Sequence, residues 1–460
     1  MSGERIVDAD VGVLGAGPGG MAAAKALAAA GLCVVVLDEG HRAGGQIFRQ
    51  LPPGAPHAAI AEPPSHAHGH ALIDGFGASK VELRSGASVW DAKPGRLWFE
   101  QDGASWLLRC KHIVLAPGAY DRCIPFPGWT LPGVLTAGAL QVMVRGFGVV
   151  PGKRALVVGS GPLLLPTVTA LASAGVEVVA ALEASSRWRA LRALPGVLGN
   201  GARLREALWY GRKLLTAGVK LQWGWTVFGV EGDGRVQRAT IGKVDADGRP
   251  RRETARTIEV DVVGAGFGLV PSIEAGLLLG CASRLLPARG GHCLVVDAEQ
   301  RTSVAGVYAV GEACGIGGAE VAMAEGELAA AAIVRLARGA PIAAGIARKA
   351  ARERKAADAL LRAFAPLPGL HELAQPETIV CRCEDVTLAR AKAAAALHGG
   401  SHRAIKIGCR AGMGPCQARI CGPSLQALAC GRPELPMDLP VAQTPLKAVR
   451  SETILNAPEG

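Results

Sequence analysis

The sequence of 460 residues predicts an α/β fold with two dinucleotide-binding units and a small cysteine-rich module near its C-terminal end. Two glycine-rich turns support this prediction, because each follows a short apolar strand and precedes an apolar helix, at residues 15–20 and 159–164. The third observation is that six of the twelve cysteines lie between positions 381 and 430. A chain of this length is expected to form two or three domains.

Composition and charge narrow the functional class. Hydrophobic residues make up 49% and charged residues 19%, which is typical of an ordered globular protein. The net charge of +11 is spread along the chain. Its densest runs, residues 249–252 and 348–355, are interpreted as solvated surface or a docking surface for a partner, not as a nucleic-acid interface, because no nucleic-acid motif accompanies them.

No run of about 18 uncharged apolar residues occurs, so no membrane-spanning helix is expected, although peripheral membrane association stays open. The first ten residues lack the basic start and apolar run of a signal peptide. The expected location is therefore the cytoplasm.

Residues 9–38 have the pattern of a complete βαβ unit. Gly15 permits the tight turn, Gly17 lets the backbone approach a pyrophosphate, and Gly20 lets the helix pack close to the strand. The helix N-terminus offers free N–H groups to phosphates. Asp38 follows the second strand at the spacing of a residue that binds ribose hydroxyls. This context predicts a dinucleotide site.

The second unit repeats this pattern with one departure. Gly159 and Gly161 form its turn, and Glu183 ends its second strand, but Leu164 stands where the third glycine belongs. The helix is therefore expected to stand further from the strand. The site is expected either to hold an adenine nucleotide (ATP or NAD(P)) or to be empty.

The C-terminal cysteines indicate a metal centre, because clustered cysteines in a reducing compartment favour metal binding over disulfides. The predicted ligand set is Cys381, Cys383, Cys416 and Cys421. Four thiolates suit an iron–sulfur cluster or zinc, but CxC with CxxxxC does not match the CxxC pairs of zinc ribbons. Cys409 is a rival ligand, and Cys430 is less suitable.

A histidine-rich stretch, residues 52–75, contains His57, His66, His68 and His70. It is also rich in Pro, Gly and Ala and lacks strand alternation, and no acid is apparent that would orient the imidazoles. We therefore expect a variable loop and not a metal site.

Three further segments resemble those of two-dinucleotide-binding, glutathione-reductase-like flavoproteins over residues 5–340: residues 44–47, 113–119 and 306–312. The resemblance implies that FAD occupies the first site. It also implies that Glu312 binds the ribityl chain, in place of the usual Asp. The additional flavin-binding residues that it implies are Gly45, Gln46, Ala116, Gly118, Gly311 and Glu312.

Residues 375–425 resemble a bacterioferritin-associated-ferredoxin-like [2Fe-2S] domain, through the cysteine set and the segment Gly412-Met-Gly-Pro-Cys416. With segments such as Gly118-Ala-Tyr-Asp-Arg122, nearly the whole chain resembles the FAD-containing α-type subunits of heteromeric amino-acid dehydrogenases. That family includes subunits of D-hydroxyproline and L-proline dehydrogenases, opine oxidases and hydrogen cyanide synthase. The domains then expected are a split FAD domain (5–123 and 263–342), an inserted NAD(P)-like domain (124–262), a linker (343–371), the [2Fe-2S] domain (372–432) and a tail (433–460).

The family resemblance also implies partners and a role. A β subunit that resembles D-amino-acid oxidases, with its own FAD, would oxidise the amine, and a small γ subunit would carry another [2Fe-2S] centre. The present chain would relay electrons to a quinone or dye-type acceptor. No catalytic residue can be named in it. The alternative is a stand-alone NAD(P)H-dependent ferredoxin-type reductase, against which the altered turn at Leu164 counts.

Overall fold

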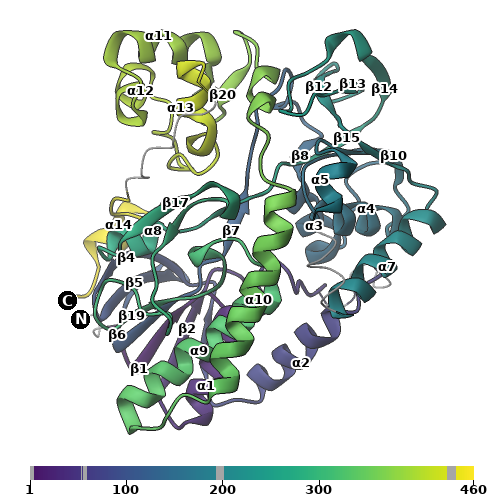
Figure 1. The fold of residues 1–460 in the computed structure, drawn as a ribbon. Coiled ribbons are helices and arrows are strands. Elements are labelled where there is room, and N and C mark those ends of the chain that lie inside the picture. The colour runs from purple at the N-terminus through teal and green to yellow at the C-terminus, as the bar shows by residue number, and fades with distance from the viewer. Residues whose placement is uncertain (1–4, 53, 55–59, 193–200, 433–441, 460) are drawn as a thin grey trace.

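The computed structural model describes residues 5–52, 54, 60–192, 201–432 and 442–459 (Figure 1). Two separate β-sheets and a small helical module make up its main parts. His57 and the beginning of the expected tail lie outside the described residues.

The first sheet has the strand order β3-β2-β1-β6-β5-β4, with β19 paired to β6. Its strands are β1 (Ile6–Leu14), β2 (Val34–Asp38), β3 (Glu82–Ser85), β4 (Ser88–Lys93), β5 (Arg96–Gln101), β6 (Ala104–Leu115) and β19 (Val307–Ala309). Strands β1, β2, β3, β6 and β19 pair in parallel, whereas β4 and β5 continue the sheet as an antiparallel hairpin. Leu14 pairs with both Leu37 and Leu115, so the central strands end at the same edge.

Helices α1 (Pro18–Ala29) and α9 (Ala319–Arg338) pack against each other beside this sheet (Figure 1). Their contact is close because Gly326 faces the backbone of Gly19, where a Cβ would overlap the carbonyl oxygen. Met21, Leu27 and Ile333 are completely buried there. The apolar faces of the two helices thus close one side of the first sheet.

The second sheet is entirely parallel, with the order β11-β10-β9-β15-β8. Its strands are β8 (Val134–Thr136), β9 (Arg154–Gly159), β10 (Glu177–Glu183), β11 (Leu221–Trp223) and β15 (Val262–Gly266). The helical segments of this region are α3 (Ala137–Gln141), the π-helix η1 (Val142–Gly146), α4 (Leu164–Ser173), α5 (Arg187–Leu191) and α7 (Gly201–Thr216). An antiparallel sheet adjoins it: β12 (Trp225–Glu231), β13 (Arg238–Lys243) and β14 (Arg256–Glu259).

The chain passes from the first sheet to the second through β7 (Ala119–Asp121) and returns through β16 (Leu269–Pro271). These two strands pair with each other in antiparallel fashion. Smaller elements follow β16 or lie near it: α8 (Glu274–Leu278), β17 (Ser283–Leu286), η3 (Pro287–Arg289), β18 (Gly291–Leu294) and η4 (Gly311–Cys314), with η2 (Arg252–Thr254) beside β13.

A long helix, α10 (Ala344–Ala363), packs along α9 and then leads through η5 (Pro368–Leu373) to the cysteine-rich module (Figure 1). That module consists of β20 (Ile379–Cys381), β21 (Val386–Thr387), α11 (Leu388–His398), α12 (His402–Cys409) and α13 (Gly422–Cys430). It has its own small core around Val386, Ile405 and Leu425.

The described part of the tail returns to the first sheet. The Leu446 N–H donates to the Trp90 carbonyl at 2.7 Å, and the Trp98 indole N–H donates to the Pro458 carbonyl at 3.1 Å. The short helix α14 (Ser451–Leu455) lies between these contacts. The described part of the tail is therefore anchored to the hairpin β4–β5.

The expectation of a variable loop over residues 52–75 is wrong for its second half, where α2 (His66–Gly77) forms a helix. The reason is a non-local apolar contact. Gly69 lies directly against the ring of Phe48, Phe76 is buried, and Leu72 packs on the core beneath α1. Acids that the sequence did not reveal also reach the imidazoles, because Glu62 contacts His70 at 2.7 Å and Glu320 contacts His68 at 3.0 Å.

The basic run 348–355 is also more than solvated surface. It lies on α10, where Arg354 retains only 13% of its side-chain exposure and forms an ion pair with Glu325. In the described portion of the chain, no helix combines the length and the apolar character needed to cross a bilayer.

Candidate functional site

The first glycine turn connects β1 to α1 in the predicted way. Gly15 has a φ of +101°, which favours glycine, and its N–H donates to the Leu37 carbonyl at 2.8 Å. A Cβ at Gly20 would overlap the carbonyl oxygen of Gly15. The turn can therefore be tight, and the helix can lie close to the strand, only with glycine at these two positions.

The start of α1 can receive a phosphate group. None of the described side chains caps it, and its first turn carries no acidic residue. A Cβ at Gly17 would find only the Cα of Gly45, at 4.0 Å. The open backbone, together with the positive end of the helix dipole, fits a pyrophosphate.

Asp38 braces this turn. Its Oδ2 accepts the N–H of Ala16 at 2.5 Å, and its Oδ1 accepts that of Gly40 at 2.7 Å. Burial raises the pKa of the Asp38 carboxyl, and the two backbone hydrogen bonds oppose that rise. Each carboxylate oxygen can accept a second hydrogen bond, so a ribose hydroxyl remains compatible with the geometry.

The other segments predicted to bind flavin meet at the same edge of the first sheet. The Gly44 N–H donates to the Ala16 carbonyl at 2.9 Å, which sets Gly45 beside the glycine turn. Ala116 donates to the Leu14 carbonyl and Val310 to that of Leu115, each at 2.9 Å. Because parallel strands present their carboxyl ends together, segments far apart in sequence form one site there.

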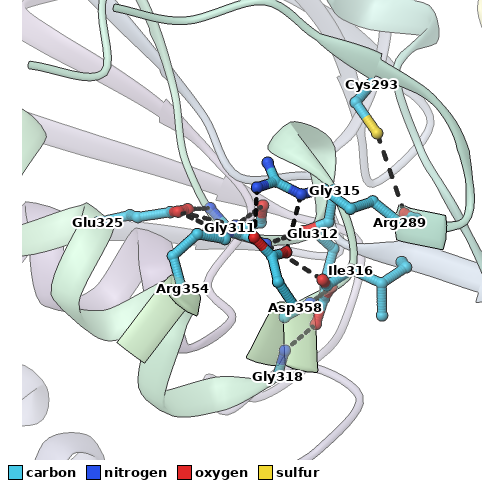
Figure 2. Close-up of polar contacts among 11 residues, drawn as sticks. Arg289, Cys293, Gly311, Glu312, Gly315, Ile316, Gly318, Glu325, Arg354 and Asp358 are labelled. Atoms are coloured by element: carbon cyan, nitrogen blue, oxygen red, sulfur yellow. Dashed lines mark hydrogen bonds and ion pairs between the residues drawn. The ribbon is translucent and has the colours of Figure 1, made fainter. Parts of the chain in front are cut away.

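Two predicted flavin contacts have partners within the protein. The Oε1 of Gln46 accepts a hydrogen bond from Arg49 at 2.8 Å. The partly buried Glu312 accepts the N–H groups of Gly317 and Gly318, at 2.8 and 2.9 Å (Figure 2). Burial raises the pKa of its carboxyl. The contact of Glu312 with a ribityl chain stays a prediction, and the structure adds that both oxygens hold the following loop.

The same loop contacts a residue that sequence reasoning missed. Arg354 of α10 donates to the carbonyls of Gly315 and Ile316 at 2.6 and 3.1 Å, and to Glu325 at 2.7 Å (Figure 2). A usable signal is the helical spacing of Ala350, Arg354 and Ala357, which indicates that Arg354 lies on the apolar side of α10.

The second glycine turn differs in what its acid does. Glu183 accepts the N–H groups of Gly161 and Ser185, each at 2.8 Å, and its side chain is buried. Burial raises the pKa of its carboxyl. Leu164, which begins α4, is also buried. The Gly161 N–H is therefore already bonded where a pyrophosphate would approach.

A pocket of about 380 Å³ lies beyond Glu183, at the carboxyl end of β10. Three arginines and an exposed tryptophan line this pocket, so its surface is strongly basic. The lining residues are Ser186, Trp188, Arg189, Arg192, Ala246, Arg362 and Ala363.

The four predicted metal ligands lie in two pairs. The thiol of Cys421 hydrogen-bonds to Cys381, which lowers the pKa of Cys381 to about 6 and raises that of Cys421. Burial, with the adjacent Cys416 thiol, raises the pKa of Cys383. The Gly412 N–H also donates to the Sγ of Cys381 at 3.4 Å, a contact typical of cluster-bound sulfur.

The rival cysteines have other partners. The Cys409 thiol donates to the Ile405 carbonyl at 3.1 Å, and Cys430 donates to that of Gly400 at 3.4 Å. Across the described ranges, no three His, Cys, Asp or Glu side chains gather closely enough to hold a metal ion. Four cysteine thiols are the ligand type that an iron–sulfur cluster requires. That these four bind a cluster stays a prediction.

The cysteine-rich module rests on the connection between the two sheets. Arg419, between Cys416 and Cys421, contacts Glu274 at 3.5 Å. Ser424 donates to the Cys123 carbonyl at 3.3 Å, and the Trp129 indole donates to the Ile379 carbonyl at 2.6 Å.

Comparisons with known proteins agree with this architecture. Residues 9–326 match the family described as pyridine nucleotide-disulphide oxidoreductase. An opine oxidase subunit of Agrobacterium tumefaciens (strain Ach5) is 32% identical to the chain, over 98% of the chain and 92% of its own length. Hydrogen cyanide synthase subunit HcnB of Pseudomonas aeruginosa is 31% identical, over 89% and 90% respectively.

Among solved structures, L-proline dehydrogenase from P. horikoshii aligns with a TM-score of 0.69 at 21% identity, covering 99% of this chain and 81% of that one. At this identity the likeness establishes the fold alone. Together with the family match, it confirms the predicted α/β fold with two dinucleotide-binding units.

Proposed function

This chain belongs to the pyridine nucleotide-disulphide oxidoreductase family and is a flavin oxidoreductase subunit of the heteromeric amino-acid oxidase and dehydrogenase type, and we propose that it carries electrons between subunits. It would use FAD and a [2Fe-2S] cluster. It would pass electrons from a partner flavin subunit to a quinone or dye-type acceptor. The complex would oxidise an amino or imino acid of the D-hydroxyproline, proline, opine or glycine type, in the cytoplasm.

The observation that carries this proposal is a chain of side-chain contacts between the two candidate sites. Tyr120, two residues after Gly118, donates to Glu274 at 3.4 Å. Glu274 contacts Arg419, which lies between two predicted cluster ligands. Glu274 and Arg419 are both largely shielded from solvent. The flavin segments and the cysteine set are therefore joined through packed protein.

The chain's own residues would bind and orient the two groups. Gly15, Gly17 and Gly20 would hold the pyrophosphate, while Gly45, Gly118 and the loop after Gly311 would surround the flavin ring. The thiolates of the cysteine set would hold the cluster. When bound, a flavin exchanges one or two electrons and a [2Fe-2S] cluster exchanges one, which suits a relay.

Amine oxidation is assigned to a partner. The relatives are named as subunits, which supports a heteromeric complex. We propose two partners: a D-amino-acid-oxidase-like β subunit with its own FAD, and a small γ subunit with a [2Fe-2S] centre. Substrate specificity would then reside in the β subunit, and no residue of this chain is assigned as the catalytic base.

The second site is proposed to bind an adenine nucleotide, ATP or NAD(P), without hydride transfer. The arginine-lined pocket supports an anionic ligand. The hydrogen bond from Gly161 to Glu183 and the leucine at position 164 argue against the usual pyrophosphate contact.

Co-expression with a D-amino-acid-oxidase-like partner tests the proposal. Amine-dependent dye reduction is expected from the complex and not from this chain alone. Rapid dye reduction by the isolated chain with NADH or NADPH would instead establish the reductase alternative. Amine-dependent turnover by the isolated chain would overturn its assignment to a heteromeric complex.

A further inference from the structure

Helix α10 contributes a buried cation to the wall of the flavin site. The side chain of Arg354 is 13% exposed, and that of its partner Glu325 is 5% exposed. Glu325 lies on α9, and its other oxygen accepts the Gly311 N–H at 2.8 Å. The ion pair thus joins two helices to the first residue of the segment that is proposed to close over the flavin.

The planar guanidinium of Arg354 donates hydrogen bonds to several backbone carbonyls. Besides Gly315 and Ile316, its Nη2 lies 3.5 Å from the Gly311 carbonyl (Figure 2). Two donors, Nε and Nη2, also reach one oxygen of Glu325, at 3.0 and 2.7 Å. Only arginine offers five donors in such a rigid fork, so lysine could not reproduce this set of contacts.

The segment that Arg354 holds contains three glycines in a conformation that other residues rarely adopt. Gly311, Gly315 and Gly318 all have positive φ, at +69°, +113° and +85°. Glycine at these positions leaves the unfolded loop with many conformations, and external contacts must select one. The carboxylate of Glu312 fixes the far end of the loop through Gly317 and Gly318.

The next turn of α10 holds the loop a second time. Asp358 receives two hydrogen bonds from Arg289, at 2.8 and 2.6 Å. The carbonyl of Arg289 accepts the Ile316 N–H at 3.0 Å. Arg354 and Asp358 therefore hold neighbouring parts of one loop, and both come from α10, which lies in the segment expected to be a helix and linker.

We infer that Arg354 is a positioning residue of the flavin site, which holds residues 311–318 in their binding conformation and raises the reduction potential of the flavin. This inference rests on the proposed FAD site. Removal of Arg354 would leave the buried Glu325 without its cation and would take the same positive charge away from the nearby Glu312. Uncompensated negative charge near a flavin disfavours the addition of electrons, so the potential would fall.

Three full-length variants test this inference: Arg354→Met, Arg354→Lys and the control Arg348→Met, whose exposed side chain lies on the same helix and donates to the Ala344 carbonyl. FAD dissociation constants would be measured by flavin fluorescence, and midpoint potentials by titration against redox dyes. Circular dichroism and thermal melting of each protein would report its folding.

Arg354→Met is expected to weaken FAD binding at least tenfold and to lower the potential of the flavin it retains. Arg354→Lys keeps the positive charge but loses the forked guanidinium. Its flavin should therefore have a potential close to that of the wild type, while its affinity for FAD stays reduced. Arg348→Met should match the wild type in both. Should Arg354→Met fail to fold, Arg354→Gln takes its place, because it also removes the positive charge and should likewise lower the potential.

Wild-type affinity and potential in either folded Arg354 variant would overturn the inference. A purely structural role would change melting and affinity in the uncharged variant, Arg354→Met or Arg354→Gln, but leave its potential unchanged, which would also overturn the inference. Absence of FAD from the wild-type chain is a distinct result, because it would refute the proposed function instead.

Discussion

The carboxylate of Asp38, at the end of β2, accepts the backbone N–H of Ala16 in the glycine turn at 2.5 Å. The other carboxylate oxygen of Asp38 accepts the N–H of Gly40, which fixes the orientation of the side chain. The turn between β1 and α1 is therefore braced by the neighbouring parallel strand before any ligand arrives. A braced turn binds phosphate with less loss of backbone freedom.

Asp38→Ala should weaken FAD binding by about tenfold, because it removes a charge-assisted hydrogen bond worth about 1.5–3 kcal/mol, part of which a water molecule can replace. Equilibrium titration followed by flavin fluorescence measures this. The exposed Asp74→Ala on α2 is the matched control. Equal affinity in both variants would show that the brace has no role in binding.

Cys383→Ser and Cys416→Ser should each remove most of the iron and the visible absorption of the cluster, since a four-thiolate set loses one ligand. Cys409→Ser and Cys430→Ser should retain both, because these thiols bond to the Ile405 and Gly400 carbonyls. Iron analysis of the four purified variants provides the comparison. If Cys409→Ser loses its iron while Cys416→Ser retains it, Cys409 and not Cys416 is the cluster ligand.

Glu274→Gln should slow electron transfer between flavin and cluster without changing the content of either cofactor. The substitution removes the negative charge that holds Arg419 of the cysteine-rich module against α8. Rapid-mixing absorbance after partial reduction measures the rate. Arg403→Ala, an exposed change on α12, should not alter it. An unchanged rate in Glu274→Gln would argue for another path.

The stability of the chain should fall between pH 7.5 and 5.5 partly through His66. Burial lowers the pKa of this imidazole, although Glu62 opposes the shift. The pKa of His66 is thus lower in the folded protein than in the unfolded chain. Its contribution to folding stability is therefore fully present above about pH 6.5, and it is lost at lower pH because the unfolded chain binds the proton more readily.

Urea unfolding at the two pH values measures this contribution. His66→Phe keeps the ring that contacts Phe48 and should reduce the pH dependence. His68→Phe, at a position with 61% side-chain exposure, should have a smaller effect. If His66→Phe retains the full pH dependence, other titratable groups cause the loss of stability.

The sequence was sufficient for features that depend on near neighbours. Gly15 and Gly20 are required by contacts within one βαβ unit, so their spacing alone predicts the turn. The same holds for the strand that ends at Asp38. The overall fold follows from two such units in one chain.

Features that depend on distant partners could not be predicted in this way. Helix α2 forms because Gly69 fits against Phe48, which the composition of residues 52–75 does not reveal. Arg354 looks like one basic residue among several until α9 supplies Glu325 and the loop after Gly311 supplies carbonyls. The bond between Glu183 and Gly161 likewise depends on side-chain direction, which spacing leaves undetermined.

The most direct measurement of the central claim is the cofactor content of the purified full-length chain, with its absorption spectrum before and after dithionite reduction. We predict about one FAD and two iron atoms per chain, and a spectrum with both flavin and [2Fe-2S] bands that bleach on reduction. A colourless protein that contains zinc and no flavin would contradict the claim.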